Sequence, residues 1–271
     1  MRFLCLHGKG TSGRIFKSQT ATFRKLLPDT YEFDFVNGPF SDGPAAGIDL
    51  FHPPPYYKLY EHLTLESLQQ GYKWLLAYIN ENGPYDAVMC FSQGCSMASS
   101  LLLYNQSLYP NSPPLFKAAI FICGVVPLDV LASLGVEVTA EARDLDRSSK
   151  VALQQQASTE AILRNGRERW GSGLNDYSTY QTEGFDKRGM VFGIDVARIP
   201  RQMKIQIPTV HVYGAKDPRF PASVTMAQFC DETVRKTFDH GGGHEIPRKR
   251  DVSKTIAELV EWCVLMATEG E

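Results

Sequence analysis

Short apolar runs alternate with longer amphipathic segments along this chain, and this alternation limits the possible folds more than any other feature. Apolar side chains at three- and four-residue steps in Leu65–Asn82 and in about Asp251–Met266 predict helices with one apolar face. Strands that alternate with helices favour a mostly parallel sheet with helices on both faces, so we predict an α/β fold. The predicted strands are Arg2–Leu6, Tyr31–Val36, Ala87–Phe91, Ala118–Cys123, Thr209–Tyr213 and Val234–Phe238.

Length and composition agree with one domain over residues 1–271. The hydrophobic fraction of 43% is enough for one contiguous core in a chain of this length. The 28 Lys and Arg residues face 30 Asp and Glu, which gives a formal net charge of −2, and no long basic run is present. A nucleic-acid partner is therefore not expected.

Signals for export or membrane insertion are not evident in the sequence. No apolar stretch reaches the roughly 18–20 residues of a membrane span. The N-terminus begins directly with a strand-like run rather than with a signal peptide. The six cysteines form no C-x-x-C pair, which disfavours a zinc site. We expect a cytoplasmic protein that uses neither a metal nor a cofactor.

Two long segments interrupt the alternation of strands and helices. Gly38–Tyr57 is rich in glycine and proline and can form neither a helix nor an inner strand. Thr139–Ile199 is long for a simple connection, and such excursions often form lids or binding loops. We predict a lid or pocket-shaping insertion at residues 139–199. A surface helix with an irregular return is the alternative.

Ser92 is the predicted nucleophile. It stands between the buried run Ala87–Phe91 and a stretch of small residues that begins a helix near Gly94. A sharp strand-to-helix turn exposes the serine Oγ and directs the helix N-terminus at the negative charge that develops there. The letters C-F-S-Q-G depart from the G-x-S-x-G pattern at Cys90, where cysteine is still small enough to fit. An ordinary helix-capping serine is the alternative.

His244 and Asp217 complete the predicted triad. His244 lies at the far end of the glycine-rich loop after the last strand, from which it can reach back over the sheet. His240, earlier in the same loop, is the competitor. Asp217 follows the fifth predicted strand, at the carboxyl edge where ligands gather in parallel sheets. The order Ser92, Asp217, His244 is that of α/β-hydrolase triads, and a turn or cap role for Asp217 is the alternative.

The turn H-G-K-G after the first strand is typical of loops that supply one N–H group of an oxyanion hole. The residue after the nucleophile supplies the other, so the predicted pair is the backbone N–H groups of Lys9 and Gln93. His7 would then orient the loop rather than act as a base. A phosphate-binding loop, matched by G-x-G-x-x-G from Gly8 to Gly13, is a weaker alternative.

At these motifs the chain resembles the FSH1-type serine hydrolases, an α/β-hydrolase family that includes OVCA-type proteins. The resemblance spans nearly the whole chain and rests on LCLHGKGTSG, YDAVMCFSQG, IPTVHVYGAKDP and GGGHEIP. It implies Ser92, Asp217 and His244 as the catalytic triad. The branch that it resembles most is found beside fungal polyketide synthases, where such enzymes release the product by thioester hydrolysis. Thr139–Ile199 is longer than in compact members, which leaves the acyl group open.

We therefore expect a serine hydrolase that cleaves an acyl ester or thioester through an acyl-serine intermediate and releases a polyketide or fatty acyl chain from a carrier protein. The alternatives are an acyltransferase with the same triad, a general short-chain carboxylesterase and a non-catalytic binding module. Tyr56 and Phe192 are the predicted substrate contacts in an apolar pocket. Lys9 and the Arg248–Arg250 cluster are candidates for steering an acidic acyl carrier protein.

Overall fold

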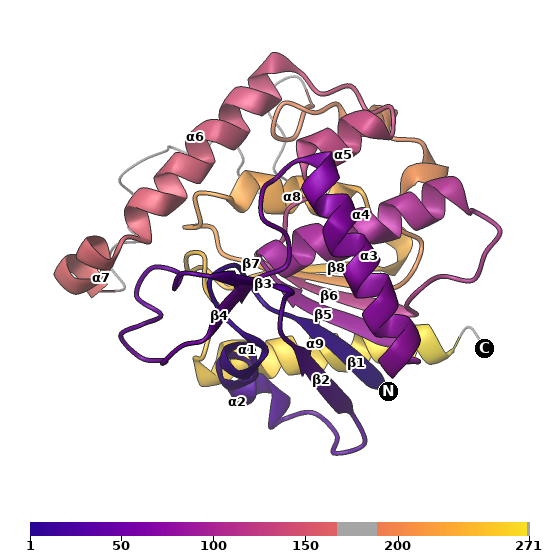
Figure 1. The fold of residues 1–271 in the computed structure, drawn as a ribbon. Coiled ribbons are helices and arrows are strands. Elements are labelled where there is room, and N and C mark those ends of the chain that lie inside the picture. The colour runs from indigo at the N-terminus through magenta and orange to yellow at the C-terminus, as the bar shows by residue number, and fades with distance from the viewer. Residues whose placement is uncertain (167–188, 270–271) are drawn as a thin grey trace.

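A six-stranded sheet forms the centre of the computed structural model, which describes residues 1–166 and 189–269 (Figure 1). The strand order is β2-β1-β5-β6-β7-β8, and every neighbouring pair is parallel. The predicted α/β fold is thus confirmed. The strands are β1 (Arg2–Leu6), β2 (Glu32–Val36), β5 (Ala87–Phe91), β6 (Ala118–Ile122), β7 (Thr209–Tyr213) and β8 (Arg235–Asp239).

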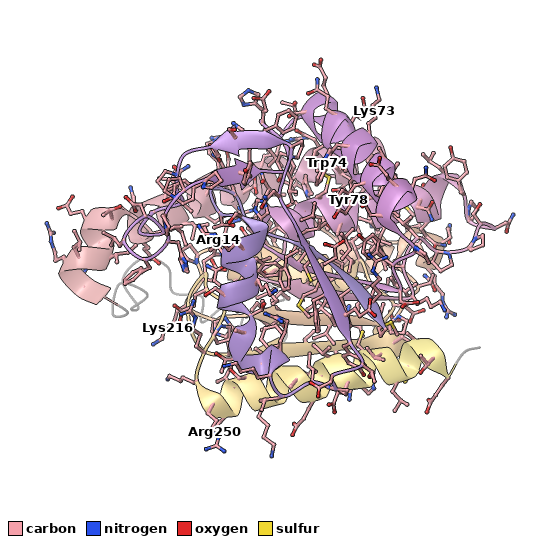
Figure 2. All side chains as sticks on the ribbon, turned by 60° about the horizontal axis from the view of Figure 1, so that its bottom comes forward. Arg14, Lys73, Trp74, Tyr78, Lys216 and Arg250 are labelled. Carbon is pink, nitrogen blue, oxygen red and sulfur yellow. The ribbon has the colours of Figure 1, made fainter. Side chains whose placement is uncertain are left out.

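Helices cover both faces of the sheet (Figure 1). On one face lie α1 (Gly13–Gln19), α2 (Ala21–Arg24) and α9 (Arg250–Thr268). On the other lie α3 (Leu65–Asn82), α4 (Gln93–Leu108), α5 (Leu128–Ser133) and α8 (Phe220–Gln228). In the turned view of Figure 2, Lys73, Trp74 and Tyr78 mark α3, and Arg250 marks the start of α9 on the opposite side.

Two apolar layers, one on each face of the sheet, explain why the strand sequences are almost continuously hydrophobic. Successive side chains of a strand point to opposite faces. In β1, Phe3 and Cys5 therefore pack into the layer under α1 and α9, while Leu4 and Leu6 pack into the layer under α3 and α4. All four side chains are fully buried. A strand covered on both faces needs apolar residues at every position.

Three strands differ from the prediction by one residue at one or both ends. β2 begins at Glu32 rather than at Tyr31. β6 ends at Ile122 because Cys123 has a φ of 50°, in the left-handed region that ends an extended run. β8 is displaced by one residue toward the C-terminus because Glu232–Val234 form the 3₁₀ helix η5 directly before it.

The glycine- and proline-rich segment Gly38–Tyr57 contributes no strand to the main sheet, as expected. It contains β3 (Phe40–Asp42), which pairs antiparallel with β4 (Tyr56–Lys58) in a separate hairpin. The loop between these strands is tied to the turn after β1, because the Ala45 N–H donates to the Gly10 carbonyl at 2.8 Å. This contact brings the loop to the carboxyl edge of the main sheet.

The predicted insertion at residues 139–199 leaves the sheet as α6 (Ala140–Gln156) and α7 (Thr159–Asn165), which extend away from the other helices (Figure 1). The Thr139 hydroxyl accepts from the Ala142 N–H at 3.0 Å and donates to the Gly193 carbonyl at 2.7 Å, so the returning chain packs on the start of α6. Residues 167–188 of the insertion lie outside the described residues, and its role as a lid stays a prediction. The short helices η3 (Val196–Arg198) and η4 (Arg201–Met203) lead back to β7.

Candidate active site

Ser92 occupies a strained turn between β5 and α4. Its φ of 51° and ψ of −109° are unusual for a residue with a side chain, and it is held there by an N–H bond to the Ile122 carbonyl of β6 at 3.0 Å. The N–H groups of Cys95 and Ser96 close the first helical turn on the Ser92 carbonyl at 3.0 and 3.2 Å. Such a strained backbone persists only where surrounding contacts hold it in place. Strained residues of this kind are common at functional sites.

Gly94 permits the close packing of this turn against β1. A Cβ atom at Gly94 would lie 2.3 Å from the carbonyl oxygen of Leu6, closer than any real side chain could come. Cys90, at the position where the pattern has its first glycine, is fully buried with its thiol 3.5 Å from the Ile120 carbonyl. The core therefore holds a cysteine at the first position of the motif, whereas the second requires glycine.

We expect Gly94→Ala to lower the free energy of unfolding by roughly 1–3 kcal/mol, because the methyl group pushes α4 away from β1. Urea unfolding measures this loss. Gly43→Ala is the matched control, since a Cβ atom at Gly43 would meet nothing within 4 Å. Equal unfolding free energies for wild type and Gly94→Ala would contradict the packing argument.

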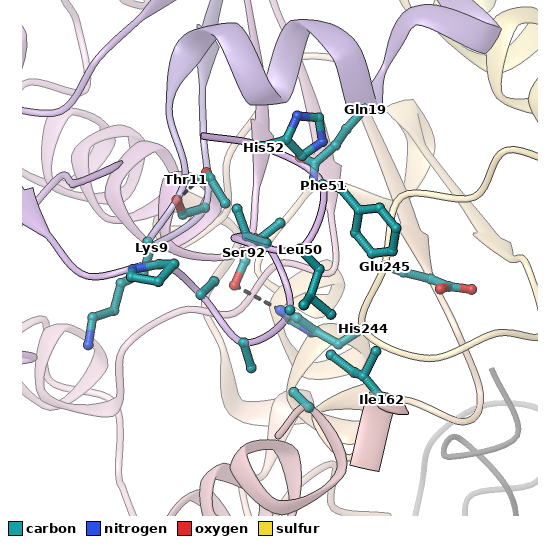
Figure 3. A pocket seen from close by; sticks show the side chains of 18 of the residues that line it. Lys9, Thr11, Gln19, Leu50, Phe51, His52, Ser92, Ile162, His244 and Glu245 are labelled. Atoms are coloured by element: carbon teal, nitrogen blue, oxygen red, sulfur yellow. Dashed lines mark hydrogen bonds between the residues drawn. The ribbon is translucent and has the colours of Figure 1, made fainter. Parts of the chain in front are cut away.

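The side chains of Ser92, His244 and Asp217 form one hydrogen-bonded chain. His244 Nε2 lies 2.8 Å from Ser92 Oγ, a bond drawn in Figure 3. On the other side of the ring, His244 Nδ1 lies 2.7 Å from Asp217 Oδ2. Asp217 is fully buried, and its Oδ1 accepts the backbone N–H of Arg219 at 2.8 Å. A carboxylate can only accept, so Nδ1 carries the proton and Nε2 is free to accept the proton of the serine hydroxyl.

Parallel strand order brings these three residues together. Ser92 follows β5, Asp217 follows β7 and His244 follows β8, so all three stand at the carboxyl edge of the sheet. Asp239 Oδ1, at the end of β8, accepts N–H groups from Ala215 at 2.9 Å and Gly241 at 2.7 Å. Asp239 thereby connects the turn that carries Asp217 to the loop that carries His244. Sequence analysis missed Asp239, although an aspartate directly before a glycine-rich loop is a signal for such a bond.

His240, the competing histidine, makes no hydrogen bond with Ser92 or Asp217 in the described structure. Its Nδ1 accepts the Gly242 N–H at 3.2 Å, and burial lowers the pKa of its imidazole. The backbone of Gly242 lies close to Gly214, because a Cβ atom added at Gly214 would be 2.1 Å from the Gly242 carbonyl oxygen. His240 therefore shapes the loop that presents His244.

The turn that carries Lys9, and Gln93 directly after Ser92, are the two segments predicted to form an oxyanion hole. A Cβ atom at Gly8 would be 3.6 Å from Ser92 Cβ, which places the turn that carries Lys9 against the serine. Gln93 begins α4, and its side chain is occupied elsewhere, with Oε1 accepting the Leu59 N–H at 2.8 Å. Among the described residues, neither the Lys9 nor the Gln93 backbone N–H has an acceptor. Their role as an oxyanion hole stays a prediction.

His7 braces the same turn as a neutral imidazole. Its Nδ1 lies 2.7 Å from the Gly8 carbonyl and its Nε2 accepts the Gly38 N–H at 3.0 Å. Burial lowers its pKa to about 4, so the ring carries one proton, on Nδ1, at neutral pH. The ring is too far buried and too fully engaged to serve as a base.

Two buried histidines make the stability of this fold sensitive to acid. Burial lowers the pKa of His7 to about 4 and that of His211 to about 3, from an ordinary value of 6.5. The unfolded chain therefore binds more protons than the native chain below pH 6.5. We expect the free energy of unfolding to fall by about 1.4 kcal/mol per pH unit for each histidine as the pH drops from 6.5 toward 4.

The variant His211→Phe tests this acid sensitivity. The ring stacks on Phe121 at 5.2 Å between centroids, so phenylalanine keeps the packing and removes the titration. Urea unfolding at several pH values between 6.5 and 4.5 should show a slope lower by about 1.4 kcal/mol per pH unit than in wild type. An unchanged slope would show that His211 titrates normally in the native state.

A cavity of about 1110 Å³ lies over Ser92 and His244, between the hairpin loop and the α6–α7 insertion (Figure 3). This is large for a small-molecule site. Its apolar lining residues include Leu50, Phe51, Leu153, Ala157, Ile162 and Leu163. Its polar lining residues include Lys9, Thr11, Gln19, Asp42, His52 and Arg248. Cavities of this kind suit amphipathic ligands.

Two polar atoms in the wall of this cavity lack partners. Gln19 Oε1 and Asp42 Oδ2 are both buried from solvent and make no hydrogen bond among the described residues. The hairpin loop touches α7, because a Cβ atom at Gly47 would lie 2.4 Å from Ile162 Cδ1. This close contact connects the hairpin loop to α7 at the cavity.

The structure does not place Tyr56 and Phe192, the predicted substrate contacts, on the walls of this cavity. Tyr56 is buried in β4, and its hydroxyl donates to the His52 carbonyl at 2.7 Å. Phe192 is buried under the guanidinium of Arg219, with 5.9 Å between Arg219 Cζ and the ring centroid. Both aromatic rings stabilise segments that surround the cavity instead of facing it.

One group of potential metal ligands is present among the described residues. The Cys123 thiol, an Asp217 carboxylate oxygen and a His244 ring nitrogen lie within 4.8 Å of one another. Two of these three atoms belong to side chains already paired by the 2.7 Å bond of the triad. The group thus supports the serine arrangement rather than a metal centre.

Comparison with known sequences decides the family. Residues 1–256 match the family described as "Serine hydrolase (FSH1)". The chain belongs to this family. The match includes Ser92, Asp217 and His244 together with the turn that carries Lys9, so the FSH1 resemblance noted in the sequence is confirmed.

Curated relatives of this FSH1 family protein are fungal hydrolases and esterases. "Hydrolase FUB4" of Fusarium oxysporum f. sp. lycopersici is 29% identical, covering 96% of this chain and 97% of the relative. "Esterase alnB" of Emericella nidulans is 29% identical, covering 97% and 96%. These names describe hydrolytic enzymes, which agrees with the serine hydrolase family of this chain.

A solved structure supports the fold. The carboxylesterase from Mesorhizobium loti superposes with a TM-score of 0.51 at 14% identity, covering 96% of this chain and 88% of the esterase. An identity this low supports the α/β-hydrolase fold alone. Every helix in the described ranges is too short or too polar to cross a bilayer.

Proposed function

We propose that this FSH1 family hydrolase uses Ser92 as nucleophile, His244 as general base and Asp217 as the carboxylate that orients the base. The observation that carries this proposal is the hydrogen-bonded chain from Asp217 Oδ2 through His244 to Ser92 Oγ, at 2.7 and 2.8 Å, on the floor of the large cavity. The buried Asp217 stabilises the imidazolium that forms when His244 takes the serine proton.

The proposed reaction has two steps. Ser92 Oγ attacks the acyl carbonyl, His244 Nε2 takes its proton and then gives it to the leaving alcohol or thiol, and an acyl-serine remains. Water, activated by the same nitrogen, then releases the acid. In both steps the backbone N–H groups of Lys9 and Gln93 bind the oxyanion. The N-terminus of α4 adds a favourable dipole at the same place.

We further propose that the substrate is a large oxygenated acyl group, as in a polyketide, joined to its carrier as a thioester. The size of the cavity and its apolar lining residues on α6 and α7, Leu153, Ile162 and Leu163, accommodate a long chain. The polar lining residues, among them Gln19 and His52, offer hydrogen-bond partners to oxygen atoms on that chain.

Basic residues at the cavity support an acidic acyl carrier protein as the donor. Lys9 and Arg248 line the cavity, and Lys249 and Arg250 continue the basic run into α9. Complementary charge mainly speeds encounter and orients the partner. The insertion at 139–199, through α6 and α7, would cover the bound acyl chain. The six buried free cysteines suit a reducing, cytoplasmic setting.

Intact-mass measurement after mixing with a panel of acyl thioesters tests the proposed function. We expect a mass increase equal to one acyl group, located on Ser92, and a stronger signal for long hydroxylated chains than for acetyl. Ser92→Ala, offered the same panel, should show no adduct. An adduct on another residue would assign the chemistry elsewhere, and adducts with acetyl alone would favour a short-chain carboxylesterase. Transfer to an added alcohol faster than to water would favour the acyltransferase alternative.

A further inference from the structure

A buried guanidinium connects the turn of the catalytic acid to the insertion. Arg219 lies two residues after Asp217 and is only 5% exposed. Its side chain crosses to α6, where Nη1 donates to the Asp146 carbonyl at 3.0 Å and to Ser149 Oγ at 2.8 Å, and Nη2 pairs with Asp146 Oδ1 at 2.8 Å. One side chain thus makes three contacts with a single turn of α6.

Asp146 and Ser149, which accept from Arg219, are also held by bonds within α6. Asp146 Oδ2 pairs with Lys150 at 2.6 Å, and the Ser149 hydroxyl donates to the Leu145 carbonyl at 2.6 Å. The ring of Phe192, on the returning chain, lies against the guanidinium of Arg219. Arg219 is therefore enclosed by both ends of the insertion.

Arg219 also belongs to the triad turn through its backbone. Its N–H donates to Asp217 Oδ1 at 2.8 Å, on the carboxyl oxygen opposite to the one that holds His244. Beyond the Arg219 contacts, Leu153 on α6 and Ala157 at its C-cap both belong to the apolar lining of the cavity. A single residue thus touches the acid of the triad and the helix that forms the acyl wall.

Energetics favour a specific role for this buried pair. Removing a charge from water is costly, and a buried ion pair is often no more stabilising than an apolar pair of the same shape. The guanidinium is planar and carries several N–H donors in fixed directions, so it can hold several acceptors in one defined geometry. The pair of Arg147 and Asp144 on the same helix differs, because both side chains are at least 70% exposed and such pairs contribute little.

We propose that Arg219 is a positioning residue that holds the α6 wall at a fixed distance from the triad and so determines the preference for long acyl chains. This inference rests on the proposed function. A short acyl group reaches Ser92 without contacting Leu153 or Ala157. A long chain must lie along α6, and it binds well only if that helix is held in place.

Steady-state kinetics on p-nitrophenyl acetate and p-nitrophenyl octanoate test this proposal. The variants are Arg219→Met, which removes every contact with α6, and Arg219→Lys, which keeps one ion pair with Asp146. Arg147→Met is the matched control, since it removes an exposed arginine from an ion pair of the same helix. Thermal unfolding of each variant verifies that it is folded.

We expect Arg219→Met to raise KM for the octanoate by about 10-fold or more and to change kcat for the acetate by less than about 3-fold. Arg219→Lys should fall between wild type and Arg219→Met, and Arg147→Met should match wild type on both esters. If Arg219→Met does not fold, Ser149→Ala removes one acceptor of the guanidinium and should raise the octanoate KM alone by about 3-fold.

Equal changes of kcat/KM on both esters, or no change on either, would overturn the positioning role. Those outcomes leave the proposed function intact, because wild type still hydrolyses the esters. A wild-type protein that hydrolyses neither ester and forms no acyl-Ser92 would remove the proposed function, and with it this inference. The two failures are thus distinguishable in one set of assays.

Discussion

Replacing Ser92 by alanine is expected to lower kcat for ester or thioester hydrolysis by about 10⁶-fold. The serine Oγ is the atom that forms the covalent bond to the acyl group, and it is the atom aligned with His244 Nε2 at 2.8 Å. Without the serine Oγ, the oxyanion donors and the cavity still bind the substrate. Direct attack by water on the bound substrate is then the remaining route, and it is much slower than attack by the serine. A chromogenic ester and a fluorophosphonate probe measure the two consequences, loss of turnover and loss of labelling.

Ser99→Ala is the matched control for this experiment. Ser99 is a fully buried serine of the same helix, and within the described residues its hydroxyl donates to the Ser96 carbonyl at 3.4 Å. The control should keep wild-type turnover and labelling. Hydrolysis that survives in Ser92→Ala at more than about a thousandth of the wild-type rate would assign the nucleophile to another residue.

Asp217→Asn is expected to lower kcat by about 10⁴-fold while leaving the fold intact. Asp217 Oδ1 accepts the Arg219 N–H, so the oxygen of an asparagine amide would take that position. The amide NH₂ would then face His244 Nδ1 and force it to accept. The proton of the imidazole would move to Nε2, which could no longer take the proton of Ser92. Single-turnover hydrolysis of the chromogenic ester measures the loss.

Asp231→Asn controls for the loss of a buried carboxylate. Asp231 is 4% exposed and caps η5 at the amino end of β8, where its Oδ1 accepts the Thr233 N–H at 2.9 Å. This variant should lose stability but keep kcat. If Asp217→Asn retained kcat within about 10-fold of wild type, the carboxylate would not set the tautomer of His244.

The inner strands and the positions of the triad residues could be predicted from local sequence patterns. The apolar runs at β1, β5, β6 and β7 predicted inner strands because a strand buried on both faces must be apolar throughout. The position of Ser92 between a buried strand and a small-residue helix is equally local. Asp217 and His244 were found because each stands just after a strand, and parallel strands place their carboxyl ends on one edge.

Substrate contacts could not be found in the same way. Tyr56 and Phe192 were chosen as aromatic residues in irregular segments, but one lies buried beneath the cavity loop and the other packs against Arg219. The direction of a side chain in a loop depends on distant segments that pack on it. Loops lack the periodic pattern that indicates the buried face of a helix or strand, so the burial of Tyr56 and Phe192 could not be predicted from the sequence.

The sequence by itself determined the α/β class, the strand-turn-helix at Ser92 and the edge of the sheet on which Asp217 and His244 stand, because these follow from short-range pattern and from chain order. Only the tertiary structure decided the 2.8 Å and 2.7 Å contacts of His244, the bridging role of Asp239 and the contact of Arg219 with α6. Arg219 and Asp146 are 73 positions apart along the chain. Their pairing arises from the packing of the insertion against the turn after β7, and that packing is a property of the whole fold.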